Sequence, residues 1–171
     1  TYSTHDGEAW SASAGTFNLT VNAVNDGPTA SGGALTINED ASATAVTLTG
    51  TDPDAGDSVE QYRIETVPTT GSLTLNGTAV TAGQTVTALQ VANGDLKFTP
   101  GANSNGSTSF TYSAHDGEAW SANTGTFNLT VSAVNDAPTV TSAGALIEGS
   151  SGPTSIQLGG ADSDSGDSVE L

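Results

Sequence analysis

The sequence contains no cysteine and no methionine, and its only basic residues are Arg63 and Lys97. Without cysteine, neither a disulfide framework nor a thiolate metal site can form, so hard oxygen atoms remain as the metal ligands. The two basic residues stand against 19 acidic ones, which gives a formal net charge of −17. Because so few cations cannot neutralise phosphates, this composition argues against nucleic acid and against an anionic membrane surface as partners.

Long apolar runs are also missing, as are a signal peptide and an initiator methionine, so we expect no membrane insertion. The sequence starts at Thr1, and we interpret it as part of a longer polypeptide. The lack of cysteine fits an extracellular bacterial protein. The abundant residues are Thr, Ser, Gly, Ala, Val and Asn, a composition typical of β-strands and turns rather than helices.

An internal repeat defines the organisation of the chain. The segment TYSTHDGEAWSASAGTFNLTVNAVNDGP (1–28) recurs as TYSAHDGEAWSANTGTFNLTVSAVNDAP (111–138) with five differences, and TGTDPDAGDSVE (49–60) recurs as GGADSDSGDSVE (159–170). Both pairs are 110 residues apart, a length typical of one sandwich domain. We therefore expect the end of one unit at 1–28, a complete unit at 29–138 and the start of a third unit at 139–171.

Short alternating apolar patterns inside the complete unit predict about seven strands. The apolar positions are Leu35/Ile37, Val46/Leu48, Tyr62/Ile64, Leu73/Leu75, Leu96/Phe98, Phe110/Tyr112 and Phe127/Leu129/Val131. Turn-forming segments separate them, and no stretch shows sustained helical periodicity. The predicted fold class is an all-β, antiparallel two-sheet sandwich.

Acidic residues gather in the predicted loops. If the strands alternate in direction, the incoming linker and the loops after the second and sixth strands lie at the same end of the unit. We expect these residues to meet there: Asn25, Asp26, Asp52, Asp54, Asp57, Asp116 and Glu118. At the opposite end we expect Glu39, Asn135 and Asp136, approached by Asp162, Asp164 and Asp167 of the next unit.

Calcium is the cofactor that this pattern favours. Carboxylates crowded into loops repel one another, and a Ca²⁺ ion relieves the repulsion because it takes about six to eight oxygen ligands. The Asp-x-Asp spacing of TDPDAGD lets alternate side chains converge on one ion, and Gly56 permits a sharp bend. The loop is not an EF-hand, since it lacks the glycine at the sixth position and the bidentate glutamate at the twelfth position of that motif. The alternative is that Asp, Asn and Gly simply form turns.

The segment His115–Trp120, repeated at 5–10, places an imidazole, two carboxylates and an indole in HDGEAW. Acid–base catalysis is conceivable for such groups, but no nucleophile, pocket or cofactor motif accompanies them, so we assign no catalytic residue and expect no enzyme. Gly117 predicts a tight turn. Asp116 is an auxiliary calcium ligand candidate, Glu118 is a weaker one, and His115 is a loop residue. The tryptophan either packs on the sheet, which we favour, or stacks on a sugar.

Several motifs together resemble the cadherin-like tandem repeats of large bacterial surface adhesins and biofilm proteins: NED, TDPDAGD, LKFTPGANSNGSTSFTYSAHDGE and LTVSAVNDAPT. The resemblance covers nearly all of 29–138 and both flanking segments. It implies an Ig/cadherin-like sandwich with calcium between successive domains. By this resemblance Glu39, Asn135 and Asp136 would share calcium with Asp162 and Asp164, and Asn25 and Asp26 with Asp52 and Asp54. The linker lacks a preceding Asp, and no Asp-Arg-Glu motif precedes the sixth strand, so the number of ions per junction stays open.

The function expected from these observations is a structural spacer or stalk repeat of a giant extracellular bacterial adhesin or surface filament, rigidified by calcium at its junctions. The alternative is a glycan- or partner-binding sandwich module of a surface protein. The expected partners are adjacent repeats of the same polypeptide or neighbouring chains in a fibre, which would complete the two partial units. Contacts with surface glycans or other cells would be made through other regions.

Overall fold

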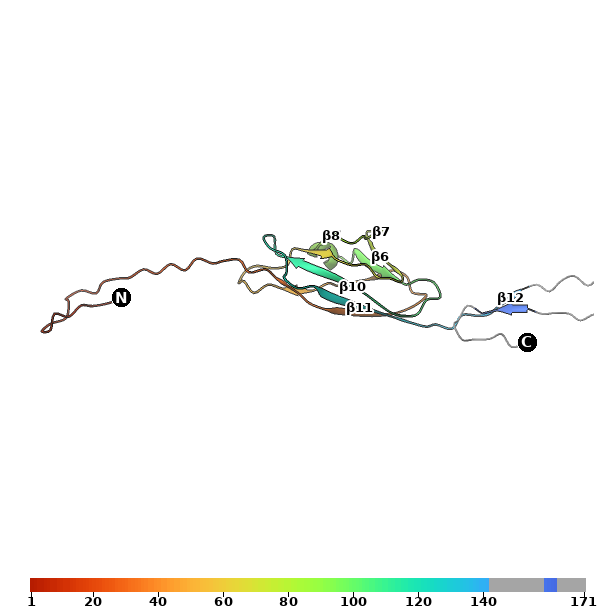
Figure 1. Ribbon diagram of the computed structural model, residues 1–171, viewed down its shortest axis with the longest axis horizontal. Coiled ribbons are helices and arrows are strands. Elements are labelled where there is room, and N and C mark those ends of the chain that lie inside the picture. Colours follow the sequence, from red (N-terminus) through yellow and green to blue (C-terminus); the bar gives the residue numbers. More distant parts are fainter. Residues whose placement is uncertain (142–158, 163–171) are drawn as a thin grey trace, which may run out of the picture.

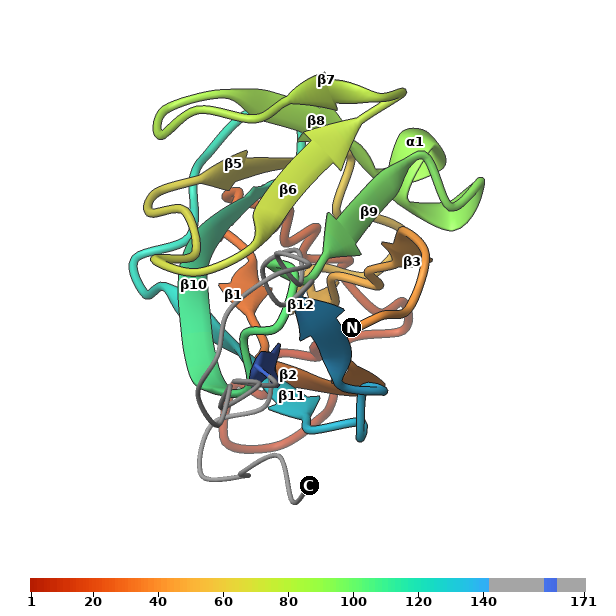
Figure 2. The ribbon, with the colours of Figure 1, turned by 90° about the vertical axis from the view of Figure 1, so that its right-hand side faces the viewer.

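The computed structural model describes residues 1–141 and 159–162, and its centre is a sandwich of two β-sheets (Figure 1). The first sheet has five strands in the order β2 (Gly33–Asn38), β11 (Gly125–Ser132), β10 (Gly106–His115), β5 (Gln61–Ile64) and β8 (Thr85–Thr87). The second has four strands in the order β3 (Thr44–Ala45), β9 (Leu96–Thr99), β6 (Ser72–Leu75) and β7 (Thr78–Ala79). Figure 2 shows the two sheets in a view along the long axis of the molecule.

Alternating side chains from both sheets form the core. In β11, Phe127, Leu129 and Val131 are buried, whereas the residues between them are exposed. The rings of Phe110 and Phe127 stack with their centroids 5.2 Å apart, and Phe98 of the opposite sheet is fully buried. This period-two burial is what a half-buried strand requires, and it confirms the predicted all-β sandwich.

Two short ribbons flank the sandwich. At the incoming end, β1 (Thr29–Ala30) pairs with β4 (Gly50–Thr51). At the outgoing end, β12 (Thr139–Thr141) pairs with β13 (Gly159–Ala161). The pairs Thr29↔Thr51 and Thr139↔Ala161 have the same register after a shift of 110 residues. The division into three units stays a prediction, and the recurring register agrees with it.

Two features differ from the expected regular antiparallel pattern. Strand β2 runs parallel to β11, with Leu35 opposite Leu129, because the chain enters β2 at the end where the linker arrives and leaves β11 at the other end. A five-residue helix, α1 (Ala88–Ala92), follows β8. Its capping box joins Thr87 and Gln90, a sequence signal that is visible without helical periodicity. None of the helices in the described residues is long and apolar enough to cross a membrane.

Residues 1–22 extend away from the sandwich as an arm, and the linker that follows them reaches its incoming end (Figure 1). The arm keeps a hairpin through the bridges Tyr2↔Gly15 and His5↔Trp10. Its apolar side chains are exposed: Leu19 is 77% exposed, whereas its repeat counterpart Leu129 is 0% exposed. The two copies of this sequence therefore share the hairpin but differ in burial, and only the second copy continues into a paired strand, β11.

Candidate metal centre

The incoming linker meets two loops of the sandwich at one end of the molecule. The backbone N–H of Asp26 donates a hydrogen bond to Asp54 Oδ2 at 2.7 Å. The side-chain amide of Asn25 donates to Asp116 Oδ2 at 3.0 Å. Asp54 lies in the loop between β4 and β5, and Asp116 lies in the hairpin between β10 and β11. The structure thus brings together the three segments that the alternation of strand direction places at this end.

Three carboxylates of the loop between β4 and β5 form a cluster. One oxygen from each of Asp52, Asp54 and Asp57 lies within 4.8 Å of the others. The loop is folded by hydrogen bonds from Asp54 N to Asp52 Oδ1 at 2.9 Å and from Asp57 N to Asp54 O at 3.2 Å. Gly56 has φ +104°, the left-handed conformation that the predicted bend requires. The loop therefore holds its three carboxylates toward a common point.

One atom of this cluster is unsatisfied. Asp52 Oδ2 is buried and has no hydrogen-bond partner among the described residues. A buried carboxylate oxygen without a donor is costly, because it loses its water without gaining a partner. A cation bound by the cluster would supply that partner. The donor set consists of oxygens only, which fits a hard ion such as Ca²⁺ better than a transition metal.

An open hollow of about 380 Å³ lies beside the cluster. It is lined by Ala23, Val24, Asn25, Asp54, Ala55, Asp57 and Glu118. Side chains from the linker, the acidic loop and the hairpin therefore border one space. The hollow is where further oxygen ligands, including water, would complete the coordination of an ion.

The hairpin motif around Asp116 is a tight turn held by its own side chains. Asp116 Oδ1 accepts hydrogen bonds from the backbone N–H groups of Glu118 and Ala119, both at 2.7 Å. Gly117 has φ +107° and donates to His115 Nδ1 at 3.0 Å. The donors from Ala119, Asn25 and Glu118 lower the pKa of Asp116 to about 2. Both Asp116 oxygens thus already have protein partners, while its role as a calcium ligand stays a prediction.

At the opposite end, Glu39 lies against the outgoing linker. Its side chain is buried, with 3% of the residue exposed, and its Oε1 accepts a hydrogen bond from Val134 N at 2.8 Å. Asn135 donates from its side chain to the Asp136 carbonyl at 3.0 Å. Asp162 directly follows β13 as Asp52 follows β4. Asp164 and Asp167 lie outside the described residues.

Sequence reasoning missed a polar cluster on the outer face of the five-stranded sheet. Arg63 Nε and Ser113 Oγ both donate to Glu65 Oε1, at 2.8 and 2.6 Å. The Arg63 guanidinium carbon lies 4.5 Å from the centre of the Trp120 ring. The cluster could have been found from the pairing of β10 with β5, which sets Ser113 opposite Arg63. Trp120 therefore packs over the sheet, as favoured from the sequence.

This cluster predicts an acid-dependent loss of stability. The Ser113 hydroxyl first, and then Arg63, lower the pKa of Glu65. A carboxyl whose pKa is lower in the folded state stabilises the fold above its unfolded value of about 4.3, and the contribution disappears as pH falls through the folded value. We expect Glu65→Gln to reduce the slope of unfolding free energy against pH below about pH 5. Urea titrations at several pH values measure this, and parallel curves for the two proteins would contradict it.

Comparison with known proteins places this sequence in a family. No curated protein matches the chain. The family model described as bacterial Ig domain matches residues 25–130, which is more than half of the chain and includes the linker, the acidic loop and the hairpin. Domains of this kind usually occur in bacterial surface and extracellular proteins. The chain therefore belongs to the bacterial Ig domain family.

Proposed function

We propose that this chain is a structural spacer of a large extracellular bacterial adhesin or surface filament, and that calcium at its inter-unit junctions stiffens it. The observation that carries the proposal is the buried, partnerless Asp52 Oδ2 within the Asp52/Asp54/Asp57 cluster. The linker hydrogen bond from Asp26 N to Asp54 supports it, because an ion held at this cluster would lie beside the segment that joins two units.

The proposed junction uses the linker and both loops. Asp52, Asp54 and Asp57 would hold the ion, Asp26 would contribute an oxygen from the linker, and Asn25 would hold the linker in place through Asp116 of the hairpin. At the outgoing end, Glu39, Asn135 and Asp136 would take the corresponding place with Asp162, Asp164 and Asp167 of the following unit. Further repeats of the polypeptide, or neighbouring chains in a fibre, would be the partners across each junction.

The energetic effect follows from ligand linkage. Extracellular calcium sites have dissociation constants of about 10⁻⁴–10⁻³ M. At millimolar calcium, such a site stabilises the bound state by up to roughly 1–2 kcal/mol. The same ion offsets repulsion among the acidic residues, which outnumber the basic ones 19 to 2 in this chain. Summed over many junctions, this stabilisation would turn a flexible string of domains into a stiff rod.

Asp52→Asn tests the proposal. In EDTA we expect the variant to be at least as stable as the parent protein, because the substitution removes an unsatisfied buried charge. In millimolar calcium we expect the parent to gain about 1–2 kcal/mol and the variant to gain little. Glu8→Gln is the control, since it removes one charge at an exposed residue of the arm. Thermal unfolding and isothermal titration measure the two effects. The same calcium response in all three proteins would rule out the site.

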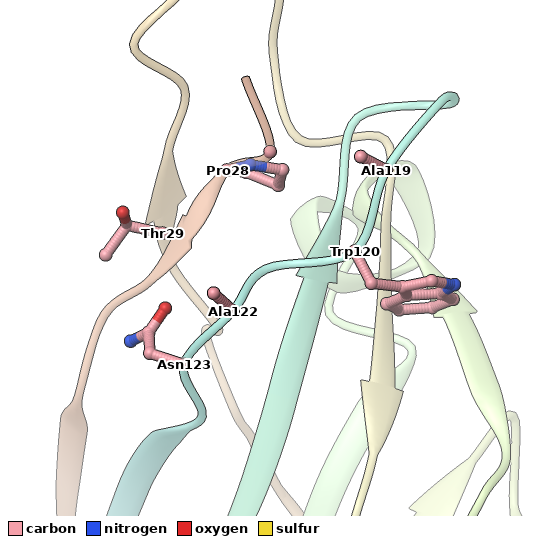
Figure 3. A pocket seen from close by; sticks show the side chains of 7 residues that line it. Pro28, Thr29, Ala119, Trp120, Ala122 and Asn123 are labelled. Atoms are coloured by element: carbon pink, nitrogen blue, oxygen red, sulfur yellow. The ribbon is translucent and has the colours of Figure 1, made fainter. Parts of the chain in front are cut away.

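The glycan-binding alternative finds less support in the site. The Arg63 guanidinium lies over the Trp120 ring, so a sugar stacking on that face would have to displace it. The His115 ring also lies 4.5 Å from Trp120 between centroids. In Figure 3 the indole ring points away from Pro28 and Asn123.

A further inference from the structure

The HDGEAW hairpin has the same internal structure in the copy on the sandwich and in the copy on the arm. The bond from Gly to His Nδ1 measures 3.0 Å at 117/115 and 3.1 Å at 7/5. The His and Trp rings lie 4.5 and 4.7 Å apart in the two copies. Asp6 accepts the same pair of backbone donors as Asp116. The hairpin is therefore shaped by its own residues, and its conformation does not depend on the sandwich beneath it.

What the second copy adds is a set of contacts to the incoming linker. Asn25 donates to Asp116 Oδ2. Gly27 lies so close to the hairpin that a Cβ built on it would be 2.9 Å from the Trp120 carbonyl oxygen. A few residues further, the Asn123 side chain donates to Ala30 O at 2.8 Å and accepts from Ala30 N at 3.1 Å. Figure 3 shows Asn123 turned toward the start of β1, with Pro28 opposite Ala119.

We propose that the segment 115–123 is a docking surface for the linker of the preceding unit, and that it holds this linker without a cation. Asn25, Asp116 and Asn123 are positioning residues that fix the linker over the acidic loop. The inference rests on the proposed function only in its last step, namely that calcium then binds to a linker already in place. The docking itself is a property of the calcium-free protein.

The hydrogen bonds at Asp116 join the hairpin directly to the linker, without an ion between them. Asn25 presents its amide N–H to Asp116, and all three donors at Asp116 are N–H groups. Asp116 therefore contacts the linker through Asn25 whether or not an ion is bound nearby. Donors held by the turn itself also keep Asp116 oriented for the linker. The pair Asn25 and Asp116 is thus complementary as it stands, with one donor and one acceptor.

Gly27 gives the docking surface its selectivity. At 2.9 Å from a backbone oxygen, an added methyl group forces the linker or the hairpin to shift. The second linker carries Ala137 at the equivalent position. A linker of the Asn-Asp-Gly-Pro type therefore fits against this hairpin. A linker of the Asn-Asp-Ala-Pro type fits only after the linker and the hairpin move apart. We expect Gly27→Ala to weaken docking in the same assay as the variants below.

Charge changes at the pair test the proposal in the full chain. Asn25→Asp places two carboxylates face to face, and we expect a roughly tenfold fall in the ratio of docked to undocked linker in EDTA. Asp116→Asn keeps a compatible pair, because the Asn25 amide can turn its oxygen to the new donor, so docking falls little. The double variant Asn25→Asp/Asp116→Asn restores a pair of one carboxylate and one amide, with the negative charge moved to position 25. Asn18→Asp adds the same charge on the exposed arm and serves as the control.

Distance measurements report docking directly. The chain has no cysteine, so Thr20→Cys and Thr78→Cys give two unique, exposed positions for spin labels on the arm and on β7. We expect Asn25→Asp to broaden the distance distribution in EDTA and the double variant to narrow it again. Equal widths for Asn25→Asp and the parent in EDTA, or no rescue by the double variant, would overturn the proposal.

Calcium titration of the same variants separates the two proposals. If Asn25 and Asp116 were ligands, Asn25→Asp would tighten calcium binding and Asp116→Asn would weaken it. Docking predicts the reverse order, with Asn25→Asp binding more weakly than Asp116→Asn. Failure of the calcium proposal would show as no calcium response in any variant, including the parent protein. The results in EDTA would be unaffected by that failure and would still decide whether the linker docks.

Discussion

Leu129→Ala lowers the free energy of unfolding of the sandwich by about 2–5 kcal/mol, whereas Leu19→Ala changes it by less than about 0.5 kcal/mol. The two leucines occupy the same place in the repeated sequence TFNLTV. Leu129 is fully buried in β11, and Leu19 is 77% exposed in the arm. Truncating the buried side chain removes its transfer free energy and leaves a cavity between the two sheets, while truncating the exposed one does neither.

Urea unfolding of both variants measures this difference. Because the two leucines have the same neighbours in sequence, the comparison reports their different tertiary environments: Leu129 lies in the paired strand β11, and Leu19 lies outside any strand. The slope of free energy against urea should be the same in both variants, since a single side chain changes little of the surface exposed on unfolding. Equal destabilisation by the two substitutions would show that the arm also packs into a core, contrary to its exposure here.

The contrast between these leucines also shows what the sequence can predict. Alternation in TFNLTV predicts a strand with one apolar face in both copies. It cannot predict that only one copy is buried, because burial depends on the strands that lie beside β11, such as β2 and β10. Likewise, Val46 and Leu48 are buried as expected, yet they follow β3 (Thr44–Ala45) rather than lying in it. Periodicity reports which face is apolar more reliably than where a ladder of hydrogen bonds ends.

The sequence was enough to predict which segments meet at the candidate site. Chain direction alone places the incoming linker, the acidic loop and the hairpin at one end, and the structure brings these three together through Asp54 and Asp116. The individual partners were not predictable. That Asn25 offers its N–H group rather than its oxygen to Asp116, and that Arg63 covers Trp120, depend on side-chain orientations that only tertiary packing sets. The register of β5 against β10 could have suggested only that Arg63 lies opposite Ser113.

Tyr112 connects the core to the junction. Its ring is fully buried, and its hydroxyl donates to the Ser31 carbonyl oxygen, directly after β1, and accepts from Thr49 N at 3.3 Å, directly before β4. Ser31 and Thr49 also bond to each other, from N to O at 3.0 Å. The hydroxyl therefore anchors both strands of the ribbon that receives the linker.

We expect Tyr112→Phe to lower the free energy of unfolding by about 1–3 kcal/mol, because it leaves a carbonyl oxygen and an N–H group at the ribbon without this partner while the ring still fills its space. Tyr2→Phe is the matched control: Tyr2 is the repeat counterpart in the arm and is 58% exposed, so removal of its hydroxyl should cost little.

Amide hydrogen exchange locates the effect of Tyr112→Phe within the structure. We expect faster exchange at Ser31 and Thr49 than elsewhere in the sandwich, since their segment loses its anchor to the core. A uniform increase across β10 and β11 would instead show that the hydroxyl stabilises the core as a whole, and that the ribbon is held by its other contacts, such as the two hydrogen bonds between Asn123 and Ala30.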